Sequence, residues 1–524
     1  MISPSLYGDR IKNITIKNFG PIKEGKIELK SLTILIGANN SGKSYAATLI
    51  YALNKAISST AFYPNFGDFI IPNHRKNPIS EIIIKTISNY FNGLNAPVTE
   101  NTFEFKIDSD EINKARTQEL KNIEKRVNDL ISREFGANIG DLKNDGKNNF
   151  QIRVETMHHS FSIENTGNKI KLTDLDPWKK SIVVKLHSTT KGDDHEEIRP
   201  TKPFTFSESL DSIKFNLELP FDIIFSNEKH VRNRVFDSFM YKILEVTIFQ
   251  ILGNTTRKPL DNETEEFYYL PAARSGILQG HTALAAAWIR LIPSTAGVSD
   301  MKIERFSGVV ADFLSNIIDF GRKKKPLFDV AENFEKEIIN GHIVLTFQHD
   351  TSNQVIEYEF KNMRIPINRS SSTVSELSPI FLFLKYTLNK GDTIIIEEPE
   401  AHLHVANQRV LARLIVSMIR NGLKVLITSH SETLLEEINN LIILKSLPDK
   451  VKKEENIGTE LYLDTNELSV LNFVYNSNGT SITPLLIDKI EGIPHDEFMR
   501  VHEKLYDEST KLRHIVDSLE GENT

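Results

Sequence analysis

Residues 37–44 read Gly37-Ala38-Asn39-Asn40-Ser41-Gly42-Lys43-Ser44. A strand-like apolar run at 32–36 precedes this stretch, and residues 44–57 after it lack Gly and Pro and carry apolar side chains at helical spacing. A strand, a glycine-rich turn and a helix in this order predict a phosphate-binding loop, because the first backbone amides of a helix bind anions. The stretch therefore indicates an α/β fold built around a bound phosphate group.

The residue types in this loop suit a nucleoside triphosphate with Mg²⁺. The glycines let the backbone curl around the β- and γ-phosphates, Lys43 is expected to neutralise the terminal phosphates, and Ser44 is expected to bind Mg²⁺. A chance match to the pattern is the alternative, so the loop alone does not establish the site. The expected ATP-binding residues are Gly37, Ala38, Asn39, Asn40, Ser41, Gly42, Lys43 and Ser44.

A second motif lies far downstream, where the apolar run 393–396 ends in Glu397-Glu398. A buried strand delivers its terminal carboxylates to the edge of a parallel sheet at which phosphates bind. We expect Glu397 to hold Mg²⁺ through water and Glu398 to act as the general base on the attacking water. Taken alone, a solvated acidic turn after a core strand is the alternative.

A third motif follows in the same manner, where the apolar run 424–427 ends in Thr428-Ser429-His430-Ser431. At this strand end His430 is expected to lie beside the γ-phosphate and to donate a hydrogen bond to it. A helix-cap neighbour without chemistry is the alternative for this histidine. The three motifs in this order, each at the end of an apolar strand, together predict an enzyme that hydrolyses ATP to ADP and phosphate.

These motifs resemble those of ABC-type P-loop ATPases of the RecF, SMC and OLD-like branch. The loop has Asn39 as its third residue, as in the ABC flavour, and residues 16–22 look like the opening strand of these ATPases. Residues 397–404, which read Glu-Glu-Pro-Glu-Ala-His-Leu-His, are similar to their Walker B and D-loop segment. Two departures are Glu397, where most relatives have Asp, and Val405, where Pro usually follows.

The resemblance implies an ABC-type α/β core with an antiparallel β lobe, a helical insert lobe and a short C-terminal α/β extension. It also implies a homodimer, or a higher oligomer, that sandwiches ATP between subunits, with Ser371 and Ser372 as a signature segment acting in trans. Arg274 lies in a segment placed like the Q-loop. A contact with phosphate, a coupling of the lobes and a structural ion pair are the alternatives for this arginine.

The expected organisation has five parts. They are the N-terminal core half at 1–100, a helical and β insertion at 101–264, a Q-loop-like strand with a helical lobe at 265–340, the C-terminal core half at 341–446, and an extension at 447–524. Within them we expect a long charged helix over 108–135, an antiparallel β insert over about 150–220, and a helix over 229–252. The pairs His158-His159 and His402, His404 lack carboxylate partners, so we interpret them as solvated rather than metal-binding.

Composition restricts the setting of the protein. The absence of cysteine fits a reducing compartment, residues 1–10 are too polar for a signal peptide, and no apolar run approaches about 18 residues. We therefore expect a cytoplasmic protein without a membrane partner. The net charge of −7 disfavours indiscriminate binding to nucleic acid but permits local basic patches.

The resemblance also suggests a biological role. Stand-alone bacterial ATPases of this kind, as in the Septu and PARIS systems, act in antiviral defence with a separately encoded effector that is a nuclease or toxin. We expect a sensor or regulatory subunit of this type; a RecF/SMC-like ATPase that binds DNA in repair, and a scaffold with vestigial hydrolysis, are the alternatives. OLD-family nucleases need an Asp-x-Asp pair in a Toprim domain, and none follows Ser446, so nuclease activity is not expected.

Overall fold

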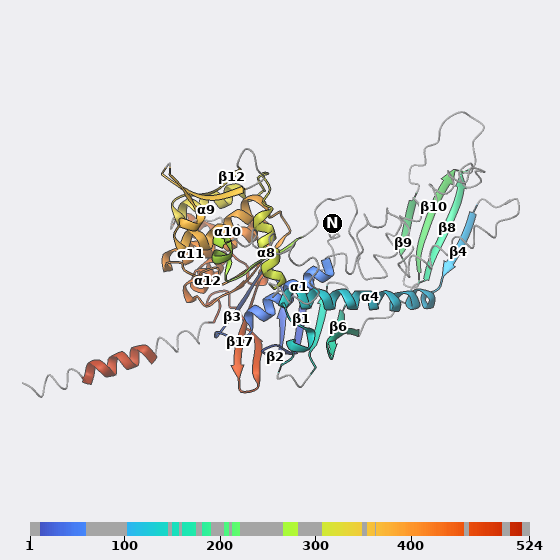
Figure 1. The fold of residues 1–524 in the computed structure, drawn as a ribbon, viewed down its shortest axis with the longest axis horizontal. Helices are drawn as coiled ribbons and strands as arrows, with labels where there is room; N and C mark the ends of the chain where they lie inside the picture. The colour runs from blue at the N-terminus through green and yellow to red at the C-terminus, as the bar shows by residue number, and fades with distance from the viewer. Residues whose placement is uncertain are drawn as a thin grey trace, which may run out of the picture.

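The computed structural model describes residues 11–58, 102–144, 149–156, 160–173, 181–189, 204–208, 212–220, 266–280, 307–347, 354–361, 363–454, 461–494 and 504–515. An 11-stranded sheet forms its centre, in the order β11-β15-β16-β3-β17-β18-β2-β1-β5-β6-β7 (Figure 1). Both the mixed α/β fold and the large sheet agree with the fold expected from the sequence. The helix predicted over 229–252 and the pair His158-His159 lie outside the described residues.

The parallel half of the sheet carries the strands predicted from the three motifs. It consists of β11 (Phe267–Leu270), β15 (Thr393–Glu397), β16 (Lys424–Thr428), β3 (Leu32–Gly37) and β17 (Leu468–Asn476), with each neighbouring pair parallel. These strands are nearly continuous apolar runs because helices cover both faces of a parallel sheet. The strands predicted at 32–36, 393–396 and 424–427 are confirmed, and β11 is the Q-loop-like strand expected within 265–340.

The other half of the sheet is largely antiparallel. It comprises β18 (Gly479–Pro484), β2 (Ile22–Glu28), β1 (Ile11–Phe19), β5 (Gln151–Thr156), β6 (Ser160–Thr166) and β7 (Lys169–Thr173). The insert expected over about 150–220 is therefore divided, since residues 151–173 extend the main sheet. Strands β17 and β18 likewise belong to this sheet, although the sequence placed them in an appended extension.

Helices cover the parallel strands on both faces. Helix α1 (Lys43–Ser58) packs on one face, where it meets Ile395, and Ile394 and Ile396 point to the opposite face. The opposite face is covered by α9 (Phe328–Ile339), α10 (Ser372–Tyr386), α11 (Val405–Arg420) and α12 (Glu432–Ser446). Helix α8 (Gly308–Ile318) contacts β11 and α4. Alternate residues of each strand thus supply two hydrophobic cores.

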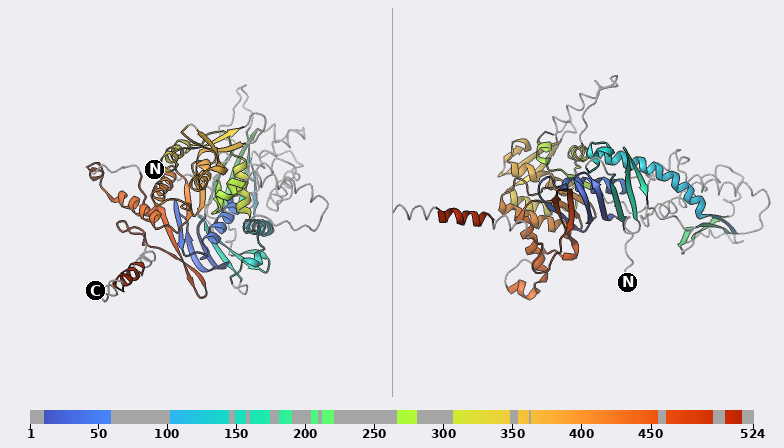
Figure 2. Two further views of the ribbon diagram at one scale, coloured as in Figure 1. Left: turned by 60° about the vertical axis from the view of Figure 1, so that its left-hand side comes forward. Right: turned by 90° about the horizontal axis from the view of Figure 1, so that it is seen from below.

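The long helix predicted over 108–135 is confirmed as α4 (Ser109–Phe135). It ends where Gly136 adopts a left-handed conformation with φ of 62°. Figures 1 and 2 show that it leads from the core to a separate sheet, in which β4 (Thr102–Ile107), β8 (Ser181–Thr189), β10 (Ser212–Pro220) and β9 (Phe204–Glu208) are neighbours in that order. Strands β8 and β10 pair in parallel, which the predicted antiparallel insert did not anticipate.

A small sheet precedes α10. Strands β12 (His342–Phe347) and β13 (Gln354–Phe360) form an antiparallel hairpin, and β14 (Met363–Pro366) completes the sheet. The shorter helices are η2 (Ile139–Leu142), η3 (Ile367–Arg369), α13 (Asp449–Glu454) and η4 (Thr465–Glu467). Residues 504–515 form a helix that extends away from the core, drawn red in Figure 2. Among the helices described, none is long and apolar enough to cross a membrane.

Candidate functional site

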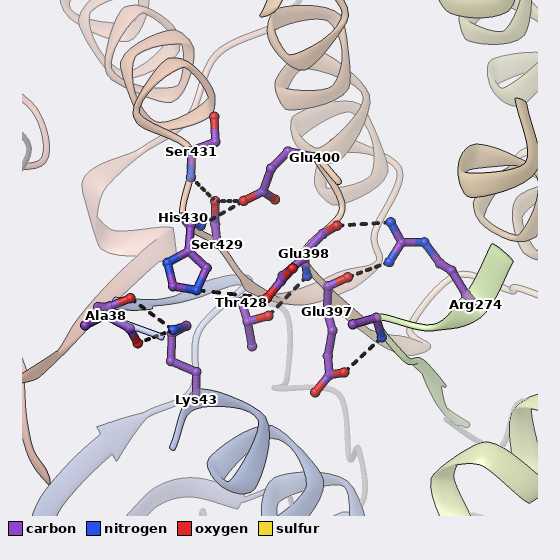
Figure 3. A network of polar contacts seen from close by, with 12 residues as sticks. Ala38, Lys43, Arg274, Glu397, Glu398, Glu400, Thr428, Ser429, His430 and Ser431 are labelled. Carbon is purple, nitrogen blue, oxygen red and sulfur yellow. Dashed lines mark hydrogen bonds and ion pairs between the residues drawn. The ribbon is translucent and has the colours of Figure 1, made fainter. Parts of the chain in front are cut away.

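The three sequence motifs meet at one edge of the sheet. Strand β16 pairs in parallel with both β3 and β15, so the carboxyl ends of these three strands are adjacent. Lys43 of the loop, Glu398 after β15 and His430 after β16 lie around the same point (Figure 3). Residues about 350 positions apart in the chain are thereby brought together, as the sequence predicted.

The loop backbone requires its glycines. Gly37 and Gly42 have φ of 135° and 97°, values that side-chain-bearing residues rarely adopt. A Cβ atom on Gly37 would lie 2.5 Å from the carbonyl oxygen of Phe473, and one on Gly42 would lie 2.7 Å from Cγ of Pro21. The glycines are therefore fixed both by backbone conformation and by close packing of neighbouring segments.

Lys43 is held inside the loop. Its ammonium donates hydrogen bonds to the carbonyl oxygens of Gly37, over 3.0 Å, and Ala38, over 2.8 Å. Burial lowers the pKa of Lys43, and the negative charges of Glu398 and Glu400 oppose that shift. The ammonium can exchange these two neutral carbonyl acceptors for charged phosphate oxygens. Hydrogen bonds to phosphate would offset more of the free-energy cost of burying the ammonium.

The other loop residues differ in exposure. Ala38, Asn39, Asn40 and Ser44 are exposed, whereas Ser41 is fully buried. Oγ of Ser41 has no hydrogen-bond partner within the described part of the chain. The exposed Ser44 hydroxyl is accessible to a ligand at the first turn of α1.

Glu398 sits in an unusual backbone conformation, with φ of 42°. Its N–H donates to the carbonyl oxygen of Thr428 over 3.0 Å and to the Thr428 hydroxyl over 3.1 Å. Its carboxylate is 44% exposed, and Oε1 lies 3.9 Å from Nε2 of His430. Burial lowers the pKa of His430, the charge of Lys43 lowers it further, and Glu398 opposes the change. The lowered pKa favours the neutral imidazole of His430, which can donate one hydrogen bond.

Glu397 has a different environment from its neighbour. One carboxylate oxygen accepts a hydrogen bond from the Tyr269 hydroxyl over 2.7 Å, and the other accepts from the N–H of Ala272 over 2.9 Å. The hydroxyl of Tyr269 also lies 3.3 Å from Oγ1 of Thr48 on α1. The carboxylate is thus oriented by two donors. Sequence reasoning missed Tyr269, whose only signal was its place in the Q-loop-like segment.

Glu400 is a second residue that sequence reasoning missed. It is 8% exposed, and Oε1 accepts hydrogen bonds from the Ser429 hydroxyl over 2.7 Å and from the N–H of His430 over 2.8 Å. Burial raises the pKa of Glu400, while the bonds from Ser429 and His430 lower it. Glu400 therefore anchors the turn that carries His430. Its only signal was its place within the acidic motif.

Arg274 is completely buried beneath the acid pair. One NH group donates to the carbonyl oxygen of Glu397 over 2.5 Å, the other donates to that of Glu398 over 3.0 Å, and Nε donates to that of Glu376 over 3.1 Å. Glu376 lies on α10, so the contacts connect this helix to the acid pair. Of the alternatives weighed for Arg274, these contacts match a coupling of the lobes, and the 3.9 Å approach of the guanidinium to Oε1 of Glu376 matches a structural ion pair.

Ser371 and Ser372 stand at the start of α10. Ser371 is the N-cap residue, and its hydroxyl accepts a hydrogen bond from the N–H of Val374 over 3.4 Å. Both serines are exposed. Capping is thus part of their role, and their side chains remain accessible from outside the subunit.

His404 caps α11, and the described residues contain no group of three or more side chains suited to holding a metal ion.

Several solved structures are similar to this chain. No curated protein sequence is significantly similar to the chain. Similar solved structures include an Smc head bound to the C-terminal winged-helix domain of ScpA, at 11% identity and a TM-score of 0.35 over 91% of this chain and 98% of that one. An Smc head with an extended coiled coil bound to the C-terminal domain of ScpA from Pyrococcus furiosus has 11% identity and a TM-score of 0.34, covering 95% and 100%. The SMC head from Thermotoga maritima has 9% identity and a TM-score of 0.32, covering 91% and 100%.

The family assignment rests on the sequence itself. The profile of the AAA ATPase domain family matches residues 10–435, which include the loop, the acid pair and His430. That range is most of the chain. The protein therefore belongs to the AAA ATPase domain family, and it is an ATPase with the P-loop α/β core predicted from its sequence.

Proposed function

We propose that the protein hydrolyses ATP between the loop 37–44 and the ends of β15 and β16. The observation that carries this proposal is the half-exposed carboxylate of Glu398, which lies 3.9 Å from Nε2 of His430 and close enough to Lys43 to influence its pKa. Phosphoryl transfer to water needs a base, a hydrogen-bond donor and a cation around the γ-phosphate. These three side chains supply them at one sheet edge.

In this proposal Glu398 takes a proton from the attacking water while the water oxygen bonds to the γ-phosphorus. The bond from that phosphorus to the β–γ bridging oxygen breaks, and ADP leaves with the electron pair. Lys43 exchanges its two carbonyl acceptors for phosphate oxygens, and neutral His430 donates a hydrogen bond to the γ-phosphate. The positive charge and the donor stabilise the charge that develops on the transferred group.

The side chains also fit Mg²⁺. Ser44 offers an exposed hydroxyl and Glu397 a carboxylate, and Mg²⁺ prefers such oxygen ligands. Because both oxygens of Glu397 already accept hydrogen bonds, a contact through a metal-bound water suits it better than direct coordination. Bound Mg²⁺ would neutralise charge on the β- and γ-phosphates.

The test is phosphate release from ATP by the full chain over a series of Mg²⁺ concentrations, with Glu398→Gln measured in parallel. Turnover that requires Mg²⁺ and falls in the variant supports the site. Turnover that persists in EDTA argues against the Mg²⁺ assignment, and an unchanged rate in the variant argues against Glu398 as the base.

The proposed assembly is a homodimer with ATP between the subunits. Support comes from the exposed hydroxyls of Ser371 and Ser372 at the start of α10, because a helix N-terminus favours phosphate. In the dimer these serines would contact the γ-phosphate bound by the partner subunit's loop. Light scattering with ATP, ADP and no nucleotide tests this assembly, and an unchanged mass in all three would contradict it.

We further propose that the ATPase serves a bacterial antiphage defence system as a sensor or regulatory subunit. Support comes from the resemblance of the three motifs to those of stand-alone bacterial ATPases that act with a separate effector. Among the described residues, the sheet at the end of α4 stands apart from the core (Figure 1), as a module for binding a partner would. Co-purification with a tagged product of the adjacent gene tests this role. If the chain instead binds DNA with an affinity that falls steeply with salt, the DNA-repair alternative is favoured.

A further inference from the structure

The backbone of Glu398 is held on both sides by residues from two other segments of the chain, Thr428 at the end of β16 and Arg274 shortly after β11. Its N–H is shared between the carbonyl oxygen and the hydroxyl of Thr428, at 3.0 and 3.1 Å. Its carbonyl oxygen accepts a hydrogen bond from Arg274 over 3.0 Å. Both backbone polar groups of Glu398 are thus satisfied inside the protein, where Thr428 is 1% and Arg274 0% exposed.

These contacts coincide with backbone strain. Glu398 has φ of 42°, in the left-handed region that residues other than glycine, asparagine and aspartate rarely occupy. Such a conformation persists only where the surrounding structure enforces it, and it is concentrated at functional sites. The direction in which the carboxylate leaves the backbone depends on this φ angle. Loss of the hydrogen bonds that hold this φ angle would therefore change the direction in which the Glu398 side chain points.

Arg274 is suited to this task by the shape of its guanidinium group. The planar fork reaches the carbonyl oxygens of Glu397, Glu398 and Glu376 at the same time. An ammonium has a single donor centre and cannot span these three positions. The same side chain also comes within 3.9 Å of Oε1 of Glu376, so the charge has a nearby counterion on α10.

We propose that Arg274 and Thr428 are positioning residues, which hold Glu398 in its left-handed conformation and so aim its carboxylate at the water that attacks ATP. The proposal rests on the base role of Glu398 in the proposed function. Through Glu376, Arg274 also fixes the start of α10 relative to this carboxylate. Neither residue touches the substrate in this arrangement.

The test uses the full chain with Arg274→Lys, Thr428→Val and Thr428→Ser. For each, kcat is measured by phosphate release at saturating Mg-ATP, and the affinity for a fluorescent ATP analogue is measured separately. We expect Arg274→Lys and Thr428→Val to lower kcat by about 10- to 100-fold, because a displacement of about 1 Å can cost 100-fold in rate. Nucleotide affinity should change by less than about 3-fold, since Lys43 and the loop are untouched.

Thr428→Ser supplies the matched comparison, since it keeps the oxygen that accepts from the N–H of Glu398. It should recover most of the rate lost in Thr428→Val. A general loss of stability is controlled by Lys385→Met, which breaks another fully buried charge contact on α10, the 2.7 Å bond from Lys385 to Glu335. That control should lower the melting temperature while leaving kcat close to wild type at a temperature where all variants are folded.

The outcomes separate this proposal from the function on which it rests. Near wild-type kcat in Glu398→Gln removes the base role itself. If Glu398→Gln is slow but Arg274→Lys and Thr428→Val turn over at the wild-type rate, the positioning role is overturned. It is also overturned if Lys385→Met loses as much rate as they do, or if Thr428→Ser is as slow as Thr428→Val. Should Arg274→Lys not fold, the two Thr428 variants, which barely change side-chain volume, decide the matter.

Discussion

The hydroxyl of Tyr269 donates a 2.7 Å hydrogen bond to Oε1 of Glu397, and the N–H of Ala272 donates to the other oxygen over 2.9 Å. The adjacent acid, Glu398, has a carboxylate that is 44% exposed. Two neighbouring glutamates at the end of one strand therefore face different surroundings. Replacing each by glutamine should therefore have different consequences.

Glu397→Gln should lower the free energy of unfolding by about 1–3 kcal/mol, because hydrogen bonds to a charged acceptor contribute more than those to a neutral one. A glutamine keeps both contacts only if its NH2 donates to the Tyr269 oxygen and the Tyr269 hydroxyl turns to donate to Oγ1 of Thr48, so the bonds to the carboxylate are replaced by weaker neutral ones. The half-saturating Mg²⁺ concentration for hydrolysis should rise. Urea unfolding and Mg²⁺ titration measure both effects, and an unfolding curve identical to wild type would contradict the first.

Glu398→Gln should preserve ATP binding, reduce kcat by about 10²- to 10⁴-fold, and accumulate as an ATP-dependent dimer. Glutamine keeps the size of the side chain but cannot accept the proton of the attacking water. Persistent γ-phosphate should stabilise the closed dimer by mass action. Phosphate release tests the slow hydrolysis and light scattering tests the dimer, with ADP as the control nucleotide. Slow turnover without any change in mass would support Glu398 as the base and contradict a dimer that holds ATP between its subunits.

Lys43→Ala should abolish measurable ATP binding. The buried ammonium is the cation inside the loop, and alanine would leave the charge of the β- and γ-phosphates uncompensated there. Calorimetry of ATP binding measures the effect. The matched control is Lys450→Ala on α13, where the side chain is 85% exposed and affinity should not change. Wild-type affinity in Lys43→Ala would remove this lysine from the site.

The pH dependence of stability should contain a contribution from Glu437. Burial raises the pKa of Glu437, but hydrogen bonds and charges from Arg409 and Arg413 outweigh it, so the net pKa lies below its usual value of 4.5. The folded state therefore favours the carboxylate, and this stabilisation is present above pH 4.5 and is lost as pH falls through the lower folded pKa. At pH 7 the free energy of unfolding of Glu437→Gln should be about 1–3 kcal/mol below that of the wild type. On acidification, the free energy of unfolding of the variant should fall less than that of the wild type.

Urea unfolding of Glu437→Gln at several pH values checks this expectation. The control is Glu359→Gln, because Glu359 pairs with Arg364 over 2.9 Å at an exposed position. Removing an exposed pair should change the free energy of unfolding by less than about 1 kcal/mol at every pH. If both variants behave alike at neutral and acidic pH, the two arginines do not stabilise the Glu437 carboxylate.

The pure chain should not cut DNA. The sequence after Ser446 contains no Asp-x-Asp, the pair that a Toprim nuclease centre needs. Incubation of supercoiled plasmid with Mg²⁺ or Mn²⁺ tests this prediction. Cleavage that disappears in a point mutant of this chain would contradict it, whereas cleavage unaffected by every such mutant would indicate a contaminating nuclease.

Local sequence patterns were sufficient to predict the core of the site. Apolar runs identified the buried strands, and the polar residues that follow each run, such as Glu398 and His430, identified its carboxyl end. Because parallel strands place their carboxyl ends at one edge, the order of motifs predicted that they would converge. The glycines of the loop could also be predicted from the sequence, because the backbone conformation that favours glycine is a local property of the chain.

Strand pairing was decided by the tertiary structure. Leu468 of β17 lies opposite Leu32 of β3, and residues 151–173 extend the sheet beyond β1. Backbone hydrogen bonds between strands are the same for almost every residue type. The sequence of a strand therefore does not specify which strand it pairs with. The choice depends on which faces can be buried together in the complete fold.

The family, the loop, the acid pair and the strands that carry them could be predicted from local patterns, because each depends on residues adjacent in the chain. The difference between the two acids arises from contacts between distant segments: Tyr269 orients Glu397, while Arg274 and Thr428 hold the backbone of Glu398. Arg274 acts on carbonyl oxygens, which every residue possesses. No side-chain pattern can therefore reveal such contacts before the chain has folded.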